Sequence, residues 1–465
     1  MISPPQATKF IPATDILTVP GLSDPVAPAA FPRHVLRFRN DRHAAGVGLD
    51  ALGDDAWIEH FGRFASLPGS LPQPLALRYH GHQFRVYNPD IGDGRGFLFA
   101  QMRDDAGRLM DLGTKGSGQT PYSRFGDGRL TLKGGVREIL ATEMLEALGV
   151  TTSKTFSLIE TGEALERGDE PSPTRSAVLV RLSHSHIRIG SFQRAAALQD
   201  TPLLRALTDY ALTRLYGVEP EENPAAHLLN LVVERTADLA ASYMIAGFVH
   251  GVLNSDNINV TGESFDYGPW RFTPYWEPGF TAAYFDRQGL YAFGRQAEAI
   301  HWDVAQLAMA LRELSDSDPL IAALERFPDL YGEAVRRRYC ARLGIAQPET
   351  AERASTLLQQ GIGAMTAGQI MIDCFFFDWR GGQLRTQEAE HRYSGEHWAA
   401  FREALDGLAD PDAARHPYWQ GDAPCSMHID EVEAIWDAIA ERDDWQPLET
   451  KIAAIRAMGE AHRQG

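Results

Sequence analysis

The sequence predicts an α+β protein of two lobes, a β-rich first lobe followed by a larger, mainly helical one. Short β-like apolar runs are confined to the first part of the chain, and long amphipathic patterns dominate after it. The 465 residues, 44% of them hydrophobic, exceed one ordinary hydrophobic core. We therefore expect an irregular, Pro-rich arm over residues 1–75, a β-rich lobe over 76–192 and a helical lobe over 193–465.

The individual elements follow from apolar spacing. Two apolar stretches between Phe97 and Lys115 flank a polar turn, which predicts an antiparallel hairpin. Helical spacing predicts a helix over about 134–148 that ends before Gly149. Two further β-like runs cover 155–159 and 177–182. Helical patterns then cover 202–216, 225–249, 298–314, 319–343, 393–408 and 429–460, the last broken near Asp444.

Composition excludes several classes of protein. The formal net charge of -18 argues against a nucleic-acid-binding protein. No run of about 18 apolar residues is present, so we expect no membrane partner. The three cysteines lie far apart without C-x-x-C spacing, which argues against a disulfide framework and favours a cytoplasmic protein.

Three glycine clusters, at residues 92–96, 113–118 and 126–129, predict a phosphate-binding region. Each cluster carries or adjoins a basic residue, and residues 76–137 hold ten basic against six acidic side chains. Glycine permits the close backbone approach that directs N–H groups at a phosphate, although one isolated cluster would indicate only a turn. Arg181 and Arg188 can add two guanidinium groups to the same anion.

Lys115 ends a predicted strand, and Glu138 follows 23 residues later in the predicted helix. In kinase-like folds a strand lysine holds nucleotide phosphates and is oriented by a helix carboxylate. The alternative is a surface lysine and an unrelated glutamate on a helix face.

The segment HGVLNSDN at residues 250–257 has the spacing of a kinase catalytic loop, and Asp266 begins a metal-site-like Asp-Tyr-Gly. Val252 occupies the position of the kinase base and cannot accept a proton. Asn257 and Asp266 still offer two oxygen ligands for Mg²⁺. Either Asp256 serves as the base for a differently placed nucleotide, or the protein binds nucleotide without turnover.

Five motifs together carry a family resemblance. They are KGSGQTPYSR at 115–124, GDGR at 126–129, HSHIR at 184–188, HGVLNSDN at 250–257 and FDYGP at 265–269. The chain resembles the selenoprotein O family over roughly residues 78–310. That resemblance implies a protein-kinase-like bilobal fold and transfer of AMP from ATP to hydroxyl side chains of proteins, with the nucleotide inverted relative to kinases.

The resemblance also implies a role for each matching position. It assigns Asp256 as proton acceptor and Asn257 and Asp266 as metal ligands. The implied nucleotide-binding residues are Gly92, Gly94, Arg95, Lys115, Asp127, Gly128, Glu138, Arg181, Arg188 and Asp266. Two departures are that Arg85 stands where the family usually has glycine, and that the selenocysteine or Cys-x-x-Cys ending of many members is absent.

These observations predict a protein adenylyltransferase that uses ATP with Mg²⁺, or alternatively Mn²⁺, on Ser, Thr or Tyr hydroxyls of proteins. UMP transfer is left open. The other hypotheses are an atypical kinase that transfers the γ-phosphoryl group and a non-catalytic nucleotide-binding scaffold.

Overall fold

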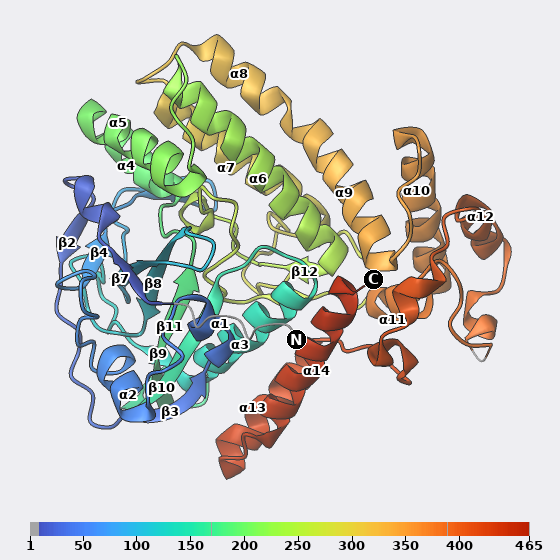
Figure 1. Cartoon of the computed structure of the whole chain (residues 1–465), viewed down its shortest axis with the longest axis horizontal. Helices are drawn as coiled ribbons and strands as arrows, with labels where there is room; N and C mark the ends of the chain where they lie inside the picture. Colours follow the sequence, from blue (N-terminus) through green and yellow to red (C-terminus); the bar gives the residue numbers. More distant parts are fainter. Residues whose placement is uncertain (1–8, 169, 388, 465) are drawn as a thin grey trace, which may run out of the picture.

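The computed structural model describes residues 9–168, 170–387 and 389–464. A curled antiparallel sheet forms the N-terminal part, and helices dominate the rest of the chain (Figure 1). This arrangement confirms the α+β, kinase-like bilobal fold class that the sequence predicts.

The large sheet has the strand order β2-β4-β7-β8-β11-β10-β3, with β1 beside β7 and β9 beside β11. Its strands are β1 (Ile11–Ala13), β2 (Ser23–Pro25), β3 (Val35–Arg39), β4 (Leu75–Leu77), β7 (Leu98–Arg103), β8 (Leu109–Lys115), β9 (Leu130–Thr131), β10 (Lys154–Leu165) and β11 (Thr174–Ser183). The predicted hairpin is confirmed as β7 and β8, which pair with Met102 opposite Met110. All seven residues of β8 are buried, which places Lys115 at the end of an inner strand.

The N-terminal segment is more regular than the expected irregular arm. Besides β1–β3, its described part contains α1 (Asp41–Gly46) and α2 (Asp54–Phe61). Each strand here is three to five residues long and pairs with a distant strand, such as β2 with β4 and β3 with β10. Such short strands are formed by their partners, so the local sequence carries little periodicity to reveal them.

Helix α3 (Leu132–Ala147) confirms the predicted helix and carries Glu138. It begins two residues earlier than expected because the Thr131 hydroxyl accepts a hydrogen bond from the backbone N–H of Gly134. Its apolar residues pack against β10 and β11 and into the main core. The helix therefore fixes Glu138 relative to the sheet.

The second lobe contains most of the predicted helices. The helices after the sheet are α4 (Ile189–Ala197), α5 (Thr201–Tyr210), α6 (Pro224–Ala246), α7 (Gln296–Leu311), α8 (Ser317–Glu325), α9 (Phe327–Leu343), α10 (Ala351–Gly368), α11 (Ile372–Asp378), α12 (Glu396–Ala404), α13 (Ile429–Arg442) and α14 (Gln446–Arg463). The predicted break near Asp444 is confirmed, because Asp443 has φ +48°.

Some helices differ from the prediction. The pattern over 319–343 is divided into α8 and α9 because Pro328 can begin a helix but cannot continue one. Helix α10 was not expected, since its glycines weaken the helical pattern. A Cβ atom at Gly361 would lie 1.8 Å from the Tyr339 hydroxyl, so this glycine permits close packing of α10 on α9.

Two small strand pairs border the space between the lobes. The hairpin of β5 (Gly81–Gln83) and β6 (Val86–Asn88) and the pair of β12 (Phe248–Val249) and β13 (Arg271–Phe272) are separate from the large sheet. The second pair brackets residues 250–270. This segment is also joined to the first lobe, because the backbone N–H of Ile189 donates to the carbonyl oxygen of Ile258.

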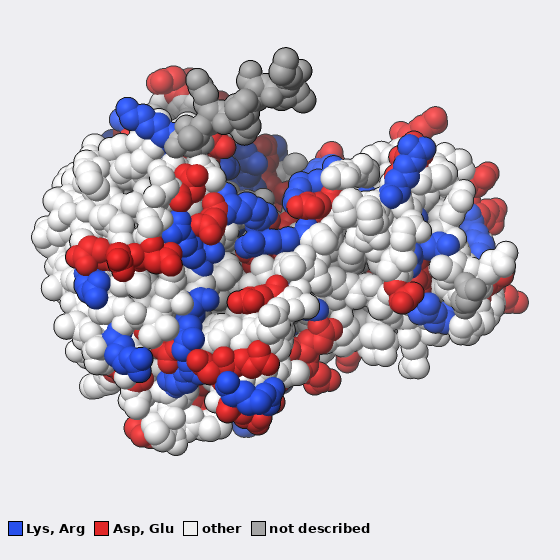
Figure 2. Space-filling view, turned by 60° about the horizontal axis from the view of Figure 1, so that its bottom comes forward, with Lys and Arg blue, Asp and Glu red and all other residues white. Residues whose placement is uncertain are grey.

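On the face shown in Figure 2, basic and acidic side chains are interspersed. Within the described part of the chain, no helix combines the length and the apolar character needed to cross a membrane.

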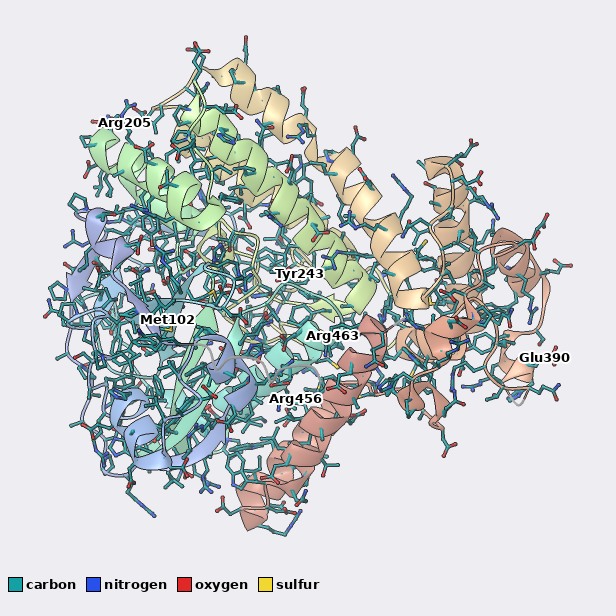
Figure 3. All side chains as sticks on the ribbon, viewed as in Figure 1. Met102, Arg205, Tyr243, Glu390, Arg456 and Arg463 are labelled. Carbon is teal, nitrogen blue, oxygen red and sulfur yellow. The ribbon has the colours of Figure 1, made fainter. Side chains whose placement is uncertain are left out.

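The last helix joins the far end of the chain to α3. Arg456, which is labelled on α14 in Figure 3, donates two hydrogen bonds, of 2.8 and 2.6 Å, to the buried carboxylate of Glu143. Asn40 and Arg42 also contact this carboxylate.

We expect Arg456→Ala to lower the free energy of unfolding by about 1–3 kcal/mol, because it removes a bidentate partner from a buried charge. Urea unfolding measures this change. The control is Arg442→Ala, whose exposed ion pair with Glu441 is worth at most about 1 kcal/mol. Equal stability of the two variants would contradict the expectation.

Candidate functional site

A cavity of about 590 Å³ lies beside the large sheet and receives side chains from both lobes. Ten of the twelve predicted site residues line it, namely Gly92, Gly94, Arg95, Lys115, Asp127, Gly128, Arg181, Arg188, Asp256 and Asp266. Glu138 lies behind Lys115, and Asn257 follows Asp256 in the chain. Residues up to 174 positions apart thus meet in one place.

Lys115 is buried at the end of β8 and forms an ion pair with Glu138 of α3. Its Nζ also lies 3.0 Å from Oδ1 of Asp266. The ammonium group is therefore held between a carboxylate of the first lobe and one of the second. This arrangement aims a positive charge at the cavity and couples the two lobes.

Asp266 has φ +62°, a conformation that a non-glycine residue rarely adopts. Its Oδ1 accepts a hydrogen bond from Arg181, at 3.3 Å, in addition to the contact with Lys115. Burial alone would raise the pKa of Asp266, but Lys115 and Arg181 hold it well below its usual range. The side chain is consequently an anionic oxygen donor at neutral pH.

Arg181 and Arg188 are buried guanidinium groups that face the cavity. The Nε atoms of both lack a hydrogen-bond partner among the described residues. Arg188 lies against the ring of Tyr79 at 4.2 Å and that of Phe265 at 4.9 Å, and donates to the backbone oxygen of Asp256. Although burial alone would lower their pKa values, nearby acidic groups raise them, so both remain charged. Two buried cations with unused donors suit a phosphate-bearing ligand.

Asp256 lies in a single helical turn over Ser255–Asn257 and is 8% exposed. In the described structure its Oδ1 has no hydrogen-bond partner. Burial raises the pKa of Asp256 to about 6, against the opposing charge of Arg188. A buried carboxylate with a raised pKa that lines a cavity can accept a proton from a bound group.

Asn257 donates its side-chain N–H to the backbone oxygen of Val252, at 3.1 Å. This bond fixes the amide orientation and leaves its oxygen available as a ligand. Among the residues described, no three His, Cys, Asp or Glu side chains gather as a metal cluster. The amide of Asn257 and the carboxylate of Asp266 are hard oxygen donors, which fit a divalent cation that takes its remaining ligands from phosphate and water.

The glycine clusters form the wall of the cavity by packing on one another. A Cβ atom at Gly92 would lie 2.5 Å from the Tyr122 ring. A Cβ atom at Gly94 would lie 3.0 Å from the backbone oxygen of Tyr122. At Gly128, which has φ +69°, a Cβ atom would lie 2.3 Å from the backbone of Gly118. These positions require glycine because a side chain would clash with the Tyr122 ring at Gly92 and with the backbone of a neighbouring loop at Gly94 and Gly128.

Asp127 lies at the rim of the cavity. Its side chain is 49% exposed and pairs with Arg167 at 2.8 Å. Burial alone would raise the pKa of Asp127, but the hydrogen bond from Arg167 lowers it below its usual value. The Asp127 carboxylate therefore stays ionised at the entrance, and Arg167 balances its charge.

Three residues that position Arg188 were not found from the sequence. Asp93 pairs with Arg188 at 3.4 Å, and Tyr79 and Phe265 lie against its guanidinium group. The position of Asp93 between Gly92 and Gly94 was a possible signal. Phe265 begins the FDYGP motif, but Tyr79 carried no signal, because its role depends on contacts between distant segments.

We expect Gly128→Ala to lose more stability than Gly107→Ala and to weaken nucleotide binding. Both positions have positive φ, so each alanine costs about 1–2 kcal/mol of strain. Only Gly128 adds a clash, since nothing lies within 4 Å of a Cβ atom at Gly107. Thermal unfolding with and without ATP measures both effects, and indistinguishable variants would contradict this account of the wall.

Comparison with known proteins identifies the family of the chain. The family model described as protein adenylyltransferase SelO matches residues 9–456. A protein nucleotidyltransferase YdiU of Synechocystis sp. is 41% identical, over 93% of this chain and 95% of its own length. The protein of the same name from Gloeobacter violaceus is 44% identical, over 93% of this chain and 92% of its own. The chain therefore belongs to the SelO family of protein adenylyltransferases and is a protein nucleotidyltransferase.

Proposed function

We propose that this nucleotidyltransferase uses ATP with Mg²⁺ and transfers AMP to Ser, Thr or Tyr hydroxyls of acceptor proteins. The observation that carries the proposal is that the buried Asp256, whose pKa is raised to about 6, lines the same cavity as the buried guanidinium groups of Arg181 and Arg188. A proton acceptor and cations for a polyphosphate are what attack by a hydroxyl on a nucleotide requires.

The proposed reaction forms one bond and breaks another. The acceptor hydroxyl oxygen bonds to the α-phosphorus, the bond from that phosphorus to the bridging oxygen breaks, and pyrophosphate leaves. The hydroxyl proton passes to the carboxylate of Asp256. Lys115, Arg181 and Arg188 bind the phosphate oxygens and balance the charge that develops during transfer.

Asn257 and Asp266 are proposed as the protein ligands of Mg²⁺. When bound, the cation neutralises phosphate charge and orients the triphosphate. Gly92, Gly94, Arg95, Asp127 and Gly128 shape the remaining nucleotide surface, and Glu138 orients Lys115.

Intact-mass analysis after incubation with ATP and Mg²⁺ tests the proposal. An acceptor that gains an AMP unit supports it, and one that gains a phosphoryl group supports the kinase hypothesis. In parallel reactions, label from the α position of ATP, and not from the γ position, is expected in the protein. A thermal shift with ATP but no covalent product would indicate a scaffold. Replacement of ATP by UTP, and of Mg²⁺ by Mn²⁺, measures the preferences for nucleotide and metal.

A further inference from the structure

A group of exposed apolar side chains lies beside the candidate catalytic segment. We call Phe84, Val86, Tyr284 and Phe285 the apolar ledge; their exposed fractions are 38%, 69%, 83% and 44%. Phe84 lies 5.8 Å from Phe285, and Phe285 lies 5.1 Å from Tyr284, measured between ring centres. Single exposed apolar residues are ordinary, but a contiguous group marks an interaction site.

The ledge is continuous with the cavity. Gln83 lines the cavity and stands opposite Val86 in the β5–β6 hairpin, so both side chains lie on the same face of the hairpin. A Cβ atom at Gly81 of the same hairpin would lie 2.9 Å from Oδ1 of Asp256. A polypeptide whose hydroxyl reaches Asp256 therefore passes beside the hairpin.

Hydrogen bonds fix the ledge to the catalytic segment. The backbone N–H of Phe84 donates to Oδ1 of Asn254 at 3.0 Å, and the Tyr291 hydroxyl donates to the same atom at 2.7 Å. The Phe84 ring also lies 5.1 Å from that of Tyr291. Asn254 is two residues before Asp256, so the ledge and the proposed base keep a fixed separation.

The hairpin turn holds Phe84 outward at an energetic cost. Phe84 has φ +51° and Arg85 has φ +62°, as a two-residue turn of this kind requires, although Asn-Gly is the favoured sequence. Arg85 is held by Glu298 at 3.0 Å and lies over the Trp302 ring. Strained non-glycine residues persist where the surrounding structure fixes them, and they concentrate at functional sites.

We propose that the apolar ledge is the docking surface for the acceptor protein. It binds an apolar side chain that lies a few residues from the modified hydroxyl in an extended acceptor segment. This inference rests on the proposed function, since it is that function that brings an acceptor hydroxyl to Asp256. The ledge then sets which hydroxyls are modified, while the cavity sets which nucleotide is used.

The test uses short synthetic peptides with a central Ser, Thr or Tyr in which one flanking position at a time is Phe, Leu or Asn. We expect Phe or Leu at one fixed flanking position to raise kcat/KM for AMP transfer by about 10- to 100-fold over Asn, a range set by burial of one apolar side chain. The variant is Phe84→Asn combined with Tyr284→Ser, because asparagine tolerates positive φ.

This variant should reduce transfer to the apolar peptides to the level of the Asn peptides, while the thermal shift with ATP and Mg²⁺ stays unchanged. The matched control is Met309→Ser combined with Ile321→Ser, two exposed apolar residues on α7 and α8, which should change nothing. No apolar preference in the parent protein, or a preference that survives in the variant, would overturn the proposal.

Anisotropy of the same peptides carrying a fluorophore measures binding without catalysis. Apolar-dependent binding that is lost in the variant supports the ledge even where no AMP is transferred, in which case the proposed function alone fails. If the peptides bind equally well with and without the apolar residue, the ledge is not the docking surface, whether or not AMP is transferred. Analytical sedimentation tests whether the ledge mediates self-association instead. If the parent protein forms a dimer and the variant does not, the ledge is a dimer interface and the proposal is overturned.

Discussion

Replacing Asp266 with alanine is expected to reduce AMP transfer by at least about a thousandfold. The side chain is proposed as a ligand of the metal, and metal stabilisation of phosphate charge is worth several kcal/mol in the transition state. Its removal should also abolish the dependence of ATP binding on Mg²⁺.

For the same variant, ATP binding in the absence of metal distinguishes a change in the charge of the cavity from a loss of folding. Asp266 neutralises Lys115 and Arg181, with which it makes contacts of 3.0 and 3.3 Å. Without it the cavity is more positive, so binding of ATP in the absence of metal should be retained or tightened. Calorimetric titration with and without Mg²⁺ measures this, and Asp266→Asn serves as the control of similar shape. Loss of metal-free binding in both variants would contradict the proposed arrangement of charges.

Replacing Asp256 with alanine is expected to slow transfer by about 10²- to 10⁴-fold, the usual contribution of a general base. ATP binding should be largely spared, because Arg188 is held through the backbone oxygen of Asp256 and not through its side chain. Single-turnover transfer of α-labelled AMP, together with the thermal shift by ATP and Mg²⁺, measures the two effects separately.

Asp256→Asn is the stricter test, since the amide keeps the size of the carboxylate but cannot accept the proton. A transfer rate equal to that of the parent protein would remove Asp256 from the role of base. Its buried carboxylate would then be a structural group that caps the turn over Ser255–Asn257.

The parts of the fold that could be predicted are those whose stability is local. The pair β7–β8 and helix α3 have strong periodicity and clear ends, and both appear where expected. Strands β1–β3 could not be found, because they depend on partners elsewhere in the chain. Helix α10 was missed because its glycines weaken the helical pattern, although Gly361 permits the close contact with Tyr339.

The candidate site also contains residues that the sequence could predict and residues that only the structure reveals. The charged residues stand in recognisable motifs, so sequence alone could assign a role to Lys115 or Asp266. Of the aromatic residues that hold Arg188, Tyr79 belongs to no motif, and Phe265 begins the FDYGP motif, although no role was assigned to it; the contact of both rings with Arg188 follows from the packing of distant segments. Motifs therefore predict which residues take part in the site, whereas the orientation of these residues requires the structure.

The contact between Glu143 and Arg456 joins positions 313 residues apart. During translation, every residue that lines the cavity leaves the ribosome before α14 does. Contacts of such wide separation form late, because the intervening chain must first be brought together. Every residue that lines the cavity is thus synthesised before the arginine that supports helix α3, and the contact between Arg456 and Glu143 completes that support late in folding.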